Sequence, residues 1–263
     1  MKFGNLEKAK ENLYIPGKEL REIKALFAVY QIYKWLIFLP LLGLSTIILT
    51  IAAVPIIWLF GERAGQISGI LWARFNSFIT PMRMTLKGEE NIDPNQSYVV
   101  VANHQSQFDI FAIYGWLPLD FRWVMKVELR KAPVLGYYCY KAGHIFINRS
   151  DHASALASIN EAKKRITGGT SIIFFPEGTR SKTGNLTEFK KGAFKFALDM
   201  QLPVLPVTIS GTKDILPASS MALFPGNATM TIHKPIDTSA YDENTIQDLI
   251  NKSRESIQDG LRF

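Results

Sequence analysis

The feature that most limits the fold of this chain is a long uncharged run near its start. From Trp35 to Gly61 the sequence reads WLIFLPLLGLSTIILTIAAVPIIWLFG, without one charged side chain. As a helix this run would be roughly 40 Å long, and the hydrocarbon core of a bilayer is about 30 Å thick. The run begins too far into the chain, and is too long, for a signal peptide. We therefore expect it to remain in the mature protein.

A second helical pattern follows a break at Gly61. Apolar side chains recur there at helical spacing, at Ile67, Ile70, Leu71, Phe75, Phe78 and Ile79. The two segments predict a membrane-associated hairpin that enters one leaflet and returns. The alternatives are a single span and a helix buried in a soluble core. Basic residues flank both ends of the apolar run, so the positive-inside rule gives no orientation.

From about residue 84 short β-rich runs alternate with helical ones, which is typical of an α/β domain. The expected strands are Tyr98–Ala102, Phe121–Val127, His144–Asn148, Ser171–Phe175, Val204–Ile209 and Thr229–His233. The expected helices are Ile110–Trp116, His152–Arg165, Lys190–Met200 and Glu243–Ile257. The sequence thus predicts two parts, an N-terminal helical hairpin over 1–83 and an α/β domain over 84–263.

Composition narrows the class of partner and of chemistry. The formal charge of +7, from 30 Lys+Arg against 23 Asp+Glu, favours an anionic partner such as a phosphate, a nucleic acid or an acidic membrane. The single cysteine, Cys139, excludes an intramolecular disulfide framework and a Cys-rich zinc site. The four histidines show no H-E-x-x-H spacing, and no G-x-S-x-G motif is present, which argues against a zinc protease and a nucleophile-elbow hydrolase.

The stretch VVVANHQSQFDIF offers a candidate base. His104 follows a β-branched run and Asp109 lies five residues later. If His104 lies in the turn before a helix and Asp109 in its first turn, the carboxylate can orient the imidazole and stabilise its protonated form. The same residues also fit a helix cap, because Ser106 and Asp109 form an S-x-x-D capping box. Physical reasoning leaves catalysis and capping open.

Other polar residues follow predicted strands, where open α/β sheets place their sites. Glu177, Gly178, Thr179 and Arg180 form a turn whose backbone N–H groups and guanidinium could hold a phosphate, although an ordinary solvated loop has the same composition. Arg149 fits a ligand or a surface charge equally well. Lys126 lies in a run that otherwise resembles a buried strand, so we expect its ammonium to reach a strand end, a carboxylate or an anionic ligand.

Four ordered motifs resemble those of the glycerolipid acyltransferase family. They are NHQSQFD, GHIFINR, FPEGTR and LPVLPVTIS, and the chain is most similar to bacterial 1-acyl-sn-glycerol-3-phosphate acyltransferases, which also carry an N-terminal helical pair. The likeness extends from about Ile51 to the end. Asn148 departs from the Asp that many relatives carry, and we expect little consequence because Arg149 is retained. The resemblance implies a single mixed β-sheet flanked by helices, the glycerol-3-phosphate acyltransferase-like fold.

The resemblance also implies roles and partners. His104 would act as general base with Asp109, on the 2-hydroxyl of lysophosphatidic acid, to give phosphatidic acid. Residues 177–180, Arg149 and Lys126 would bind the phosphate, and Pro206 would shape the acyl-donor pocket. The co-substrate would be acyl-CoA or acyl carrier protein, with no cofactor, metal or nucleic acid.

The expected location is a bacterial inner membrane, with the α/β domain on the cytoplasmic side and the hairpin against membrane lipids. One alternative is an acyltransferase for another lysolipid, such as a lyso-ornithine lipid. The other is a non-catalytic module that binds membrane lipid or nucleic acid; the intact His104 and Asp109 pair and the lack of a dense basic tract argue against it.

Overall fold

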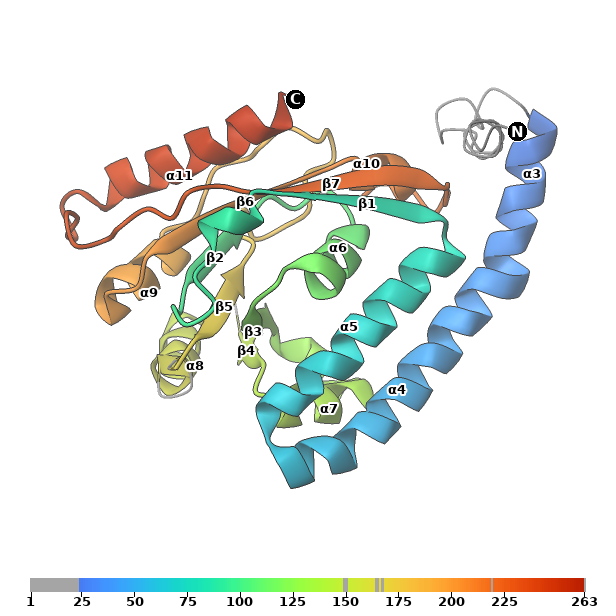
Figure 1. Ribbon diagram of the computed structural model, residues 1–263, viewed down its shortest axis with the longest axis horizontal. Helices are drawn as coiled ribbons and strands as arrows, with labels where there is room; N and C mark the ends of the chain where they lie inside the picture. Colours follow the sequence, from blue (N-terminus) through green and yellow to red (C-terminus); the bar gives the residue numbers. More distant parts are fainter. Residues whose placement is uncertain (1–23, 149–150, 164–165, 167, 219, 263) are drawn as a thin grey trace, which may run out of the picture.

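A computed structural model shows an N-terminal helical hairpin packed on a seven-stranded sheet (Figure 1). It describes residues 24–148, 151–163, 166, 168–218 and 220–262. The strands lie in the order β1-β7-β6-β2-β5-β3-β4. Every pair is parallel except β6 with β7, so the sheet is mixed, as the sequence predicted.

The strands agree with most of the predicted ranges. They are β1 (Met82–Lys87), β2 (Val99–Ala102), β3 (Asp120–Lys126), β4 (Ile145–Ile147), β5 (Thr170–Phe174), β6 (Val204–Ser210) and β7 (Gly226–Ile232). The sequence analysis did not include β1, which pairs with β7 at the edge of the sheet. In the centre, β2 is buried on both faces, which explains why its sequence is continuously apolar.

Two helical layers cover the sheet, and alternate side chains of β2 point into them. Val100 and Ala102 join the core beneath α6 (Phe108–Trp116) and the hairpin, with α10 (Thr212–Ile215) nearby. Val99 and Val101 join the second core, under α8 (His152–Lys163), α9 (Gly192–Met200) and α11 (Ile246–Leu261). The 3-10 turn η2 (Glu89–Asn91) connects β1 to β2.

The N-terminal helix is longer than the predicted run. α3 (Lys24–Tyr33), a π-helical turn η1 (Lys34–Phe38) and α4 (Leu39–Phe60) form one continuous helix, which is long and apolar enough by composition to cross a membrane. Pro40 is the second residue of α4, and its missing N–H accounts for a break in the regular hydrogen-bond ladder near η1. The chain reverses at Gly61, whose φ of +84° favours glycine, and α5 (Glu62–Ile79) returns beside α4.

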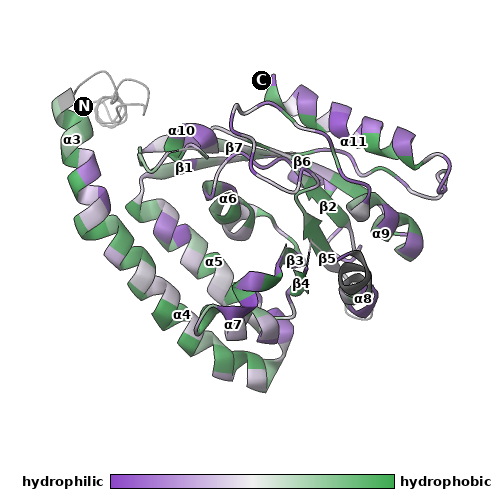
Figure 2. Ribbon diagram, turned by 180° about the vertical axis from the view of Figure 1, so that it is seen from behind, coloured by the Kyte–Doolittle hydropathy of each residue, from purple (hydrophilic) through white to green (hydrophobic). Residues whose placement is uncertain are grey.

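The hairpin turns its apolar residues outward. On α5, Ile67, Leu71 and Phe78 are exposed, and Phe78 is 80% exposed. The inward face of α5 consists of small and polar residues: Gly65, Gln66, Gly69, Ala73, Asn76 and Ser77. In Figure 2, α4 is coloured mainly green and white, and Trp58, Leu59 and Phe60 of this helix are among the most exposed side chains. A folded chain rarely exposes so large an apolar surface to water.

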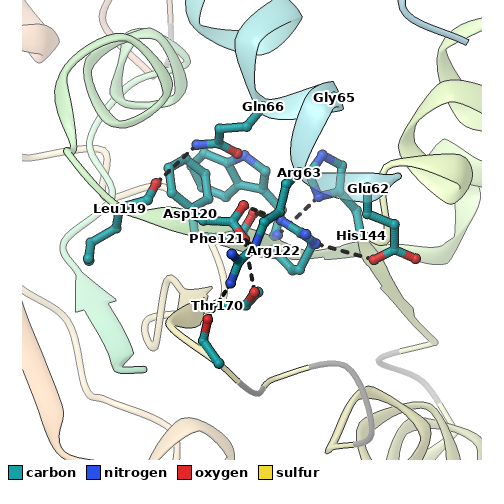
Figure 3. Close-up of polar contacts among 12 residues, drawn as sticks. Glu62, Arg63, Gly65, Gln66, Leu119, Asp120, Phe121, Arg122, His144 and Thr170 are labelled. Atoms are coloured by element: carbon teal, nitrogen blue, oxygen red, sulfur yellow. Dashed lines mark hydrogen bonds and ion pairs between the residues drawn. The ribbon is translucent and has the colours of Figure 1, made fainter. Parts of the chain in front are cut away.

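Charged residues fix the tip of the hairpin to β3 (Figure 3). Arg122, buried in β3, lies 2.7 Å from Asp120 and 3.5 Å from Glu62 at the start of α5. Arg63 lies 3.2 Å from Asp120, which also accepts a hydrogen bond from Thr170. We call these five residues the tip network. It ties the first turn of α5 to the sheet, so the hairpin and the α/β part have a defined relative position.

Candidate active site

His104 and Asp109 meet at the junction between β2 and α6. His104 lies in the turn after β2, and Asp109 in the first turn of α6. The imidazole Nδ1 is 2.8 Å from Oδ2 of Asp109, which is fully buried, whereas His104 keeps 14% of its side chain exposed. The pairing predicted from the spacing is therefore present in the structure.

The capping interpretation also holds in part. Asp109 Oδ2 accepts hydrogen bonds from the backbone N–H groups of Gln105 and Ser106, at 2.7 and 2.8 Å. The hydroxyl of Thr212, at the start of α10, donates to the other carboxylate oxygen. Each oxygen of the carboxylate thus has donors that hold it in place. The helix start fixes the carboxylate in the position from which it orients His104, so capping and orientation are compatible.

Further contacts hold His104 from the other side. Phe175, directly after β5, stacks on the imidazole with ring centres 3.9 Å apart and planes 10° apart. The backbone N–H of Ser181 donates to the carbonyl of His104 at 2.7 Å. With Asp109 bonded to Nδ1, Nε2 is the nitrogen left to accept a proton. The sequence analysis missed Phe175 and Thr212, because neither ring stacking nor a contact from a distant segment leaves a local signal.

A cavity of about 570 Å³ opens beside His104. His104 shares its lining with Gly178, Thr179, Arg180 and Lys126. His104 and Arg180, which the sequence analysis assigned to proton transfer and to phosphate binding, therefore line the same cavity. Other walls come from the hairpin, with Thr46, Leu49 and Thr50 from α4 and Ser68, Gly69 and Trp72 from α5. Further lining residues are mostly apolar, among them Ile110, Trp123, Val124, Met125, Leu129 and Leu135, so the cavity combines a base, cations and a mainly apolar lining.

The turn after β5 has the conformation that glycine permits. Gly178 has φ of +75°, as the bend predicted from the sequence requires. A Cβ atom at this position would lie 2.9 Å from the ammonium nitrogen of Lys190, so that cation lies against the turn. Lys190 was not among the predicted site residues, although the Lys190-Lys191 pair in the sequence was a usable signal.

Glu177 requires a correction. It is not part of the cavity lining, and protein donors hold both of its oxygens. Oε1 accepts from the backbone N–H of His104 at 2.8 Å, and Oε2 accepts from the N–H and hydroxyl of Thr187 at 3.0 and 2.8 Å. A carboxylate so occupied would also repel a phosphate. Glu177 supports the backbone of His104 instead of binding an anion.

We expect Glu177→Gln to lower the free energy of unfolding by about 1–3 kcal/mol. Both carboxylate oxygens accept from backbone N–H groups, and an amide keeps only one acceptor oxygen. Urea unfolding in detergent measures the loss. Thr187→Val, which removes one hydroxyl donor and leaves both N–H donors paired, should cost less. Equal stability of Glu177→Gln and the unmodified chain would contradict the supporting role.

The remaining predicted residues are placed as follows. Lys126 ends β3 with its side chain exposed, lines the cavity, and lies 2.9 Å from Glu128, so it reaches a carboxylate as expected. Pro206 is not in the cavity lining; it is buried in β6 opposite Val101, and its carbonyl accepts from the N–H of His233. Arg149 lies outside the described residues.

His144 is a second buried histidine that lines the cavity. Its Nε2 is 2.7 Å from the hydroxyl of Tyr114, and its Nδ1 accepts a hydrogen bond from the N–H of Trp123 at 3.3 Å. Burial, aided by the nearby charge of Arg122, lowers the pKa of His144 from 6.5 to about 3. The ring is therefore neutral at physiological pH and acts as a structural link between β3 and α6.

This depressed pKa predicts acid sensitivity. Between pH 6.5 and 3 the unfolded chain binds a proton at His144 that the folded chain does not, so stability falls as the pH is lowered through this window. We expect unfolding experiments in detergent to show this loss. His144→Gln, which can still donate to Tyr114 and accept from Trp123, should flatten the profile in the same window. An unchanged profile in that variant would contradict the assignment.

Comparison with known proteins points to one family. Residues 83–210 match the Acyltransferase family model. The chain is 33% identical over 221 residues to the chloroplastic 1-acyl-sn-glycerol-3-phosphate acyltransferase LPAT1 of Arabidopsis thaliana, covering 82% of this chain and 60% of that protein. A relative named 1-acyl-sn-glycerol-3-phosphate acyltransferase in Chlamydomonas reinhardtii is 34% identical over 181 residues, 68% of this chain and 53% of the relative. The chain thus spans about half to two thirds of these two proteins.

Two more comparisons cover larger shares of the other protein. The human 1-acyl-sn-glycerol-3-phosphate acyltransferase alpha is 28% identical over 211 residues, 80% of this chain and 75% of that protein. The crystal structure of the 1-acyl-sn-glycerophosphate acyltransferase PlsC from Thermotoga maritima superposes with a TM-score of 0.68 at 26% identity, covering 84% of this chain and 95% of the other. The matched model, the ordered motifs and the shared fold together show that residues 83–210 of this chain form a domain of the acyltransferase family.

Proposed function

We propose that this protein transfers a fatty acyl group from an acyl thioester to the 2-hydroxyl of 1-acyl-sn-glycerol-3-phosphate, giving phosphatidic acid. One observation carries the proposal: the imidazole of His104, oriented by Asp109, shares a cavity with Arg180 and with a mainly apolar lining. A base, a cation and an apolar wall match the hydroxyl, the phosphate and the acyl chains of these substrates. The names of the relatives support the same acceptor.

The chemistry needs no acyl-enzyme. Nε2 of His104 takes the proton of the acceptor hydroxyl as its oxygen attacks the thioester carbonyl carbon. The tetrahedral intermediate then collapses, the carbon–sulfur bond breaks, and the thiolate leaves with the proton returned from the imidazolium. The carboxylate of Asp109, which backbone N–H donors hold in place, stabilises that imidazolium. The co-substrate is acyl-CoA or acyl carrier protein, and the reaction requires no further cofactor.

The phosphate of the acceptor would lie at the turn after β5. Arg180 and Thr179 are exposed there and line the cavity, and Lys190 adds a positive charge beside Gly178. Lys126 contributes a further cation on the cavity lining. A guanidinium and a backbone turn bind phosphate through charge-assisted hydrogen bonds.

Attachment to a membrane is part of the proposal. The outward apolar faces of α4 and α5 need an apolar solvent, and both substrate and product of the reaction are lipids. The fold has the hairpin that the sequence predicted, and a one-leaflet insertion suits the antiparallel α4 and α5. Placement on the cytoplasmic side of a bacterial inner membrane stays a prediction.

The test is an acyl-transfer assay on the purified chain in detergent. Acyl-CoA or acyl carrier protein is offered with a panel of acceptors that includes lysophosphatidic acid, other lysophospholipids and a lyso-ornithine lipid, and thiol release is followed. We expect release with lysophosphatidic acid. Thiol release with a different acceptor only would identify that lipid as the substrate instead. No thiol release with any acceptor would refute the enzymatic function.

A further inference from the structure

A surface segment beside the cavity places basic and apolar side chains together. The 3-10 turn η3 (Val127–Lys131) and α7 (Leu135–Lys141) follow β3, and with Lys126 they make up what we call the η3–α7 segment, residues 126–141. Its exposed large apolar side chains are Leu129, Val134, Tyr137 and Tyr140. Its charged side chains are Lys126, Glu128, Arg130, Lys131 and Lys141, an excess of three positive charges.

Contacts within the segment hold charges against aromatic rings. The guanidinium carbon of Arg130 lies 3.5 Å from the ring centre of Tyr140, and the ammonium of Lys141 lies 5.7 Å from that of Tyr137. The cations and the rings therefore form one surface layer instead of separate patches. Tyrosine beside lysine and arginine is the composition that proteins present to the headgroup region of a membrane.

The position of the segment also suits a membrane. α7 lies beside the hairpin in both views (Figures 1 and 2). Tyr138 and Cys139 on its inner face, with Ala142 just after it, pack against Ala53 and Ile57 of α4. The exposed apolar surface of α4 thus adjoins the η3–α7 segment.

The segment also reaches the cavity. Leu129 is exposed and also lines the cavity that contains His104. It therefore contributes to the cavity wall and to the outer surface at once, so the surface layer extends to the edge of the cavity.

We propose that the η3–α7 segment is a second membrane contact, which docks on the headgroup layer of an anionic bilayer beside the cavity opening. This inference rests on the membrane attachment proposed above and adds a named surface to it. Anionic lipid is favoured over an acidic protein because the segment adjoins α4, whose apolar face would already hold the bilayer there. Each basic side chain near an anionic surface adds attraction that salt screens.

The test places a fluorescent probe on the full chain reconstituted in vesicles. Tyr137→Cys and, as a control, Asn251→Cys on the exposed side of α11 are each labelled with an environment-sensitive dye. Burial raises the pKa of the native Cys139 thiol to about 12, so we expect that thiol to stay protonated and unlabelled. Treating the unmodified chain with the dye checks this. The vesicles contain phosphatidylcholine with or without phosphatidylglycerol, and carry spin-labelled lipid as the quencher.

With phosphatidylglycerol present, we expect quenching and a blue shift at position 137 and neither at position 251. Lys131→Glu, in the Tyr137→Cys chain, should reduce the quenching, as should high salt or removal of phosphatidylglycerol. Equal access of both probes to aqueous iodide, in chains that co-sediment with the vesicles, would overturn the contact. Shielding of position 137 by acyl carrier protein in detergent, together with no quenching by lipid, would assign the surface to a protein instead.

Acyl transfer by the same labelled chains separates this inference from the proposed function. Activity with a water-exposed position 137 refutes only the contact. Quenching at position 137 in a chain that acylates no lysolipid refutes only the proposed reaction.

Discussion

Replacing His104 with alanine is expected to lower kcat for acyl transfer about 10²-fold to 10⁴-fold. The variant loses the nitrogen that takes the proton of the acceptor hydroxyl, while Arg180 and the apolar walls of the cavity remain. The effect should therefore be on kcat much more than on the KM for the lysolipid. Thiol release from acyl-CoA in detergent measures both constants.

His233→Gln is the matched control for this variant. His233 lies outside the cavity, where its Nε2 is 2.7 Å from the hydroxyl of Thr208, and an amide can replace that contact. Its kcat should stay close to that of the unmodified chain. A His104→Ala protein with the normal melting temperature and undiminished kcat would remove His104 from the mechanism.

Replacing Asp109 with asparagine is expected to lower kcat about 10²-fold to 10⁴-fold without unfolding the chain. The oxygen of the amide can take the place of Oδ2 and accept from His104, Gln105 and Ser106. The amide NH₂ then faces Thr212, whose hydroxyl can rotate to accept it. The hydrogen bonds survive in this arrangement, but the negative charge that stabilises the imidazolium is lost.

Asp109→Ala provides the contrast. It leaves two buried backbone N–H groups and the Thr212 hydroxyl without their acceptor, at about 1–3 kcal/mol for each group. We expect a clearly lower melting temperature, and loss of activity through loss of structure. If Asp109→Asn were equally unstable, capping would account for this residue without any catalytic role.

Local patterns were sufficient for much of this fold. β2 follows from its run of β-branched residues, and α9 and α11 from helical periodicity, because each pattern reports burial within one element. β1 was missed although Met82–Lys87 alternates apolar with polar residues, a strand pattern, because the run is short and its partner β7 lies far along the chain. α7 was missed because a glycine and aromatic residues, which form helices poorly, make up most of it; packing on α4 decides its form.

Prediction of the site was limited in the same way, because contacts within a short stretch of chain could be predicted and contacts between distant segments could not. The His104 and Asp109 contact was predictable because five residues of local chain join the two side chains. Glu177 was misassigned because its partners, His104 and Thr187, come from separate segments, and only the folded chain shows that its oxygens are already bonded. The pattern on α5 indicated an amphipathic helix. It could not indicate which face would pack on the sheet, since that depends on the solvent outside.

The inward face of α5 restricts how this chain can vary over evolution. A Cβ at Gly69 would lie 2.1 Å from the ring of Tyr114, and one at Gly65 would lie 2.9 Å from Ile57. Outward residues such as Leu71 and Phe78 meet no such neighbour and can exchange among apolar types. Homologous sequences should therefore keep a small residue at every fourth position of this helix, while its apolar residues vary. In a helix of a water-soluble protein, by contrast, the apolar face is buried and its residues vary least.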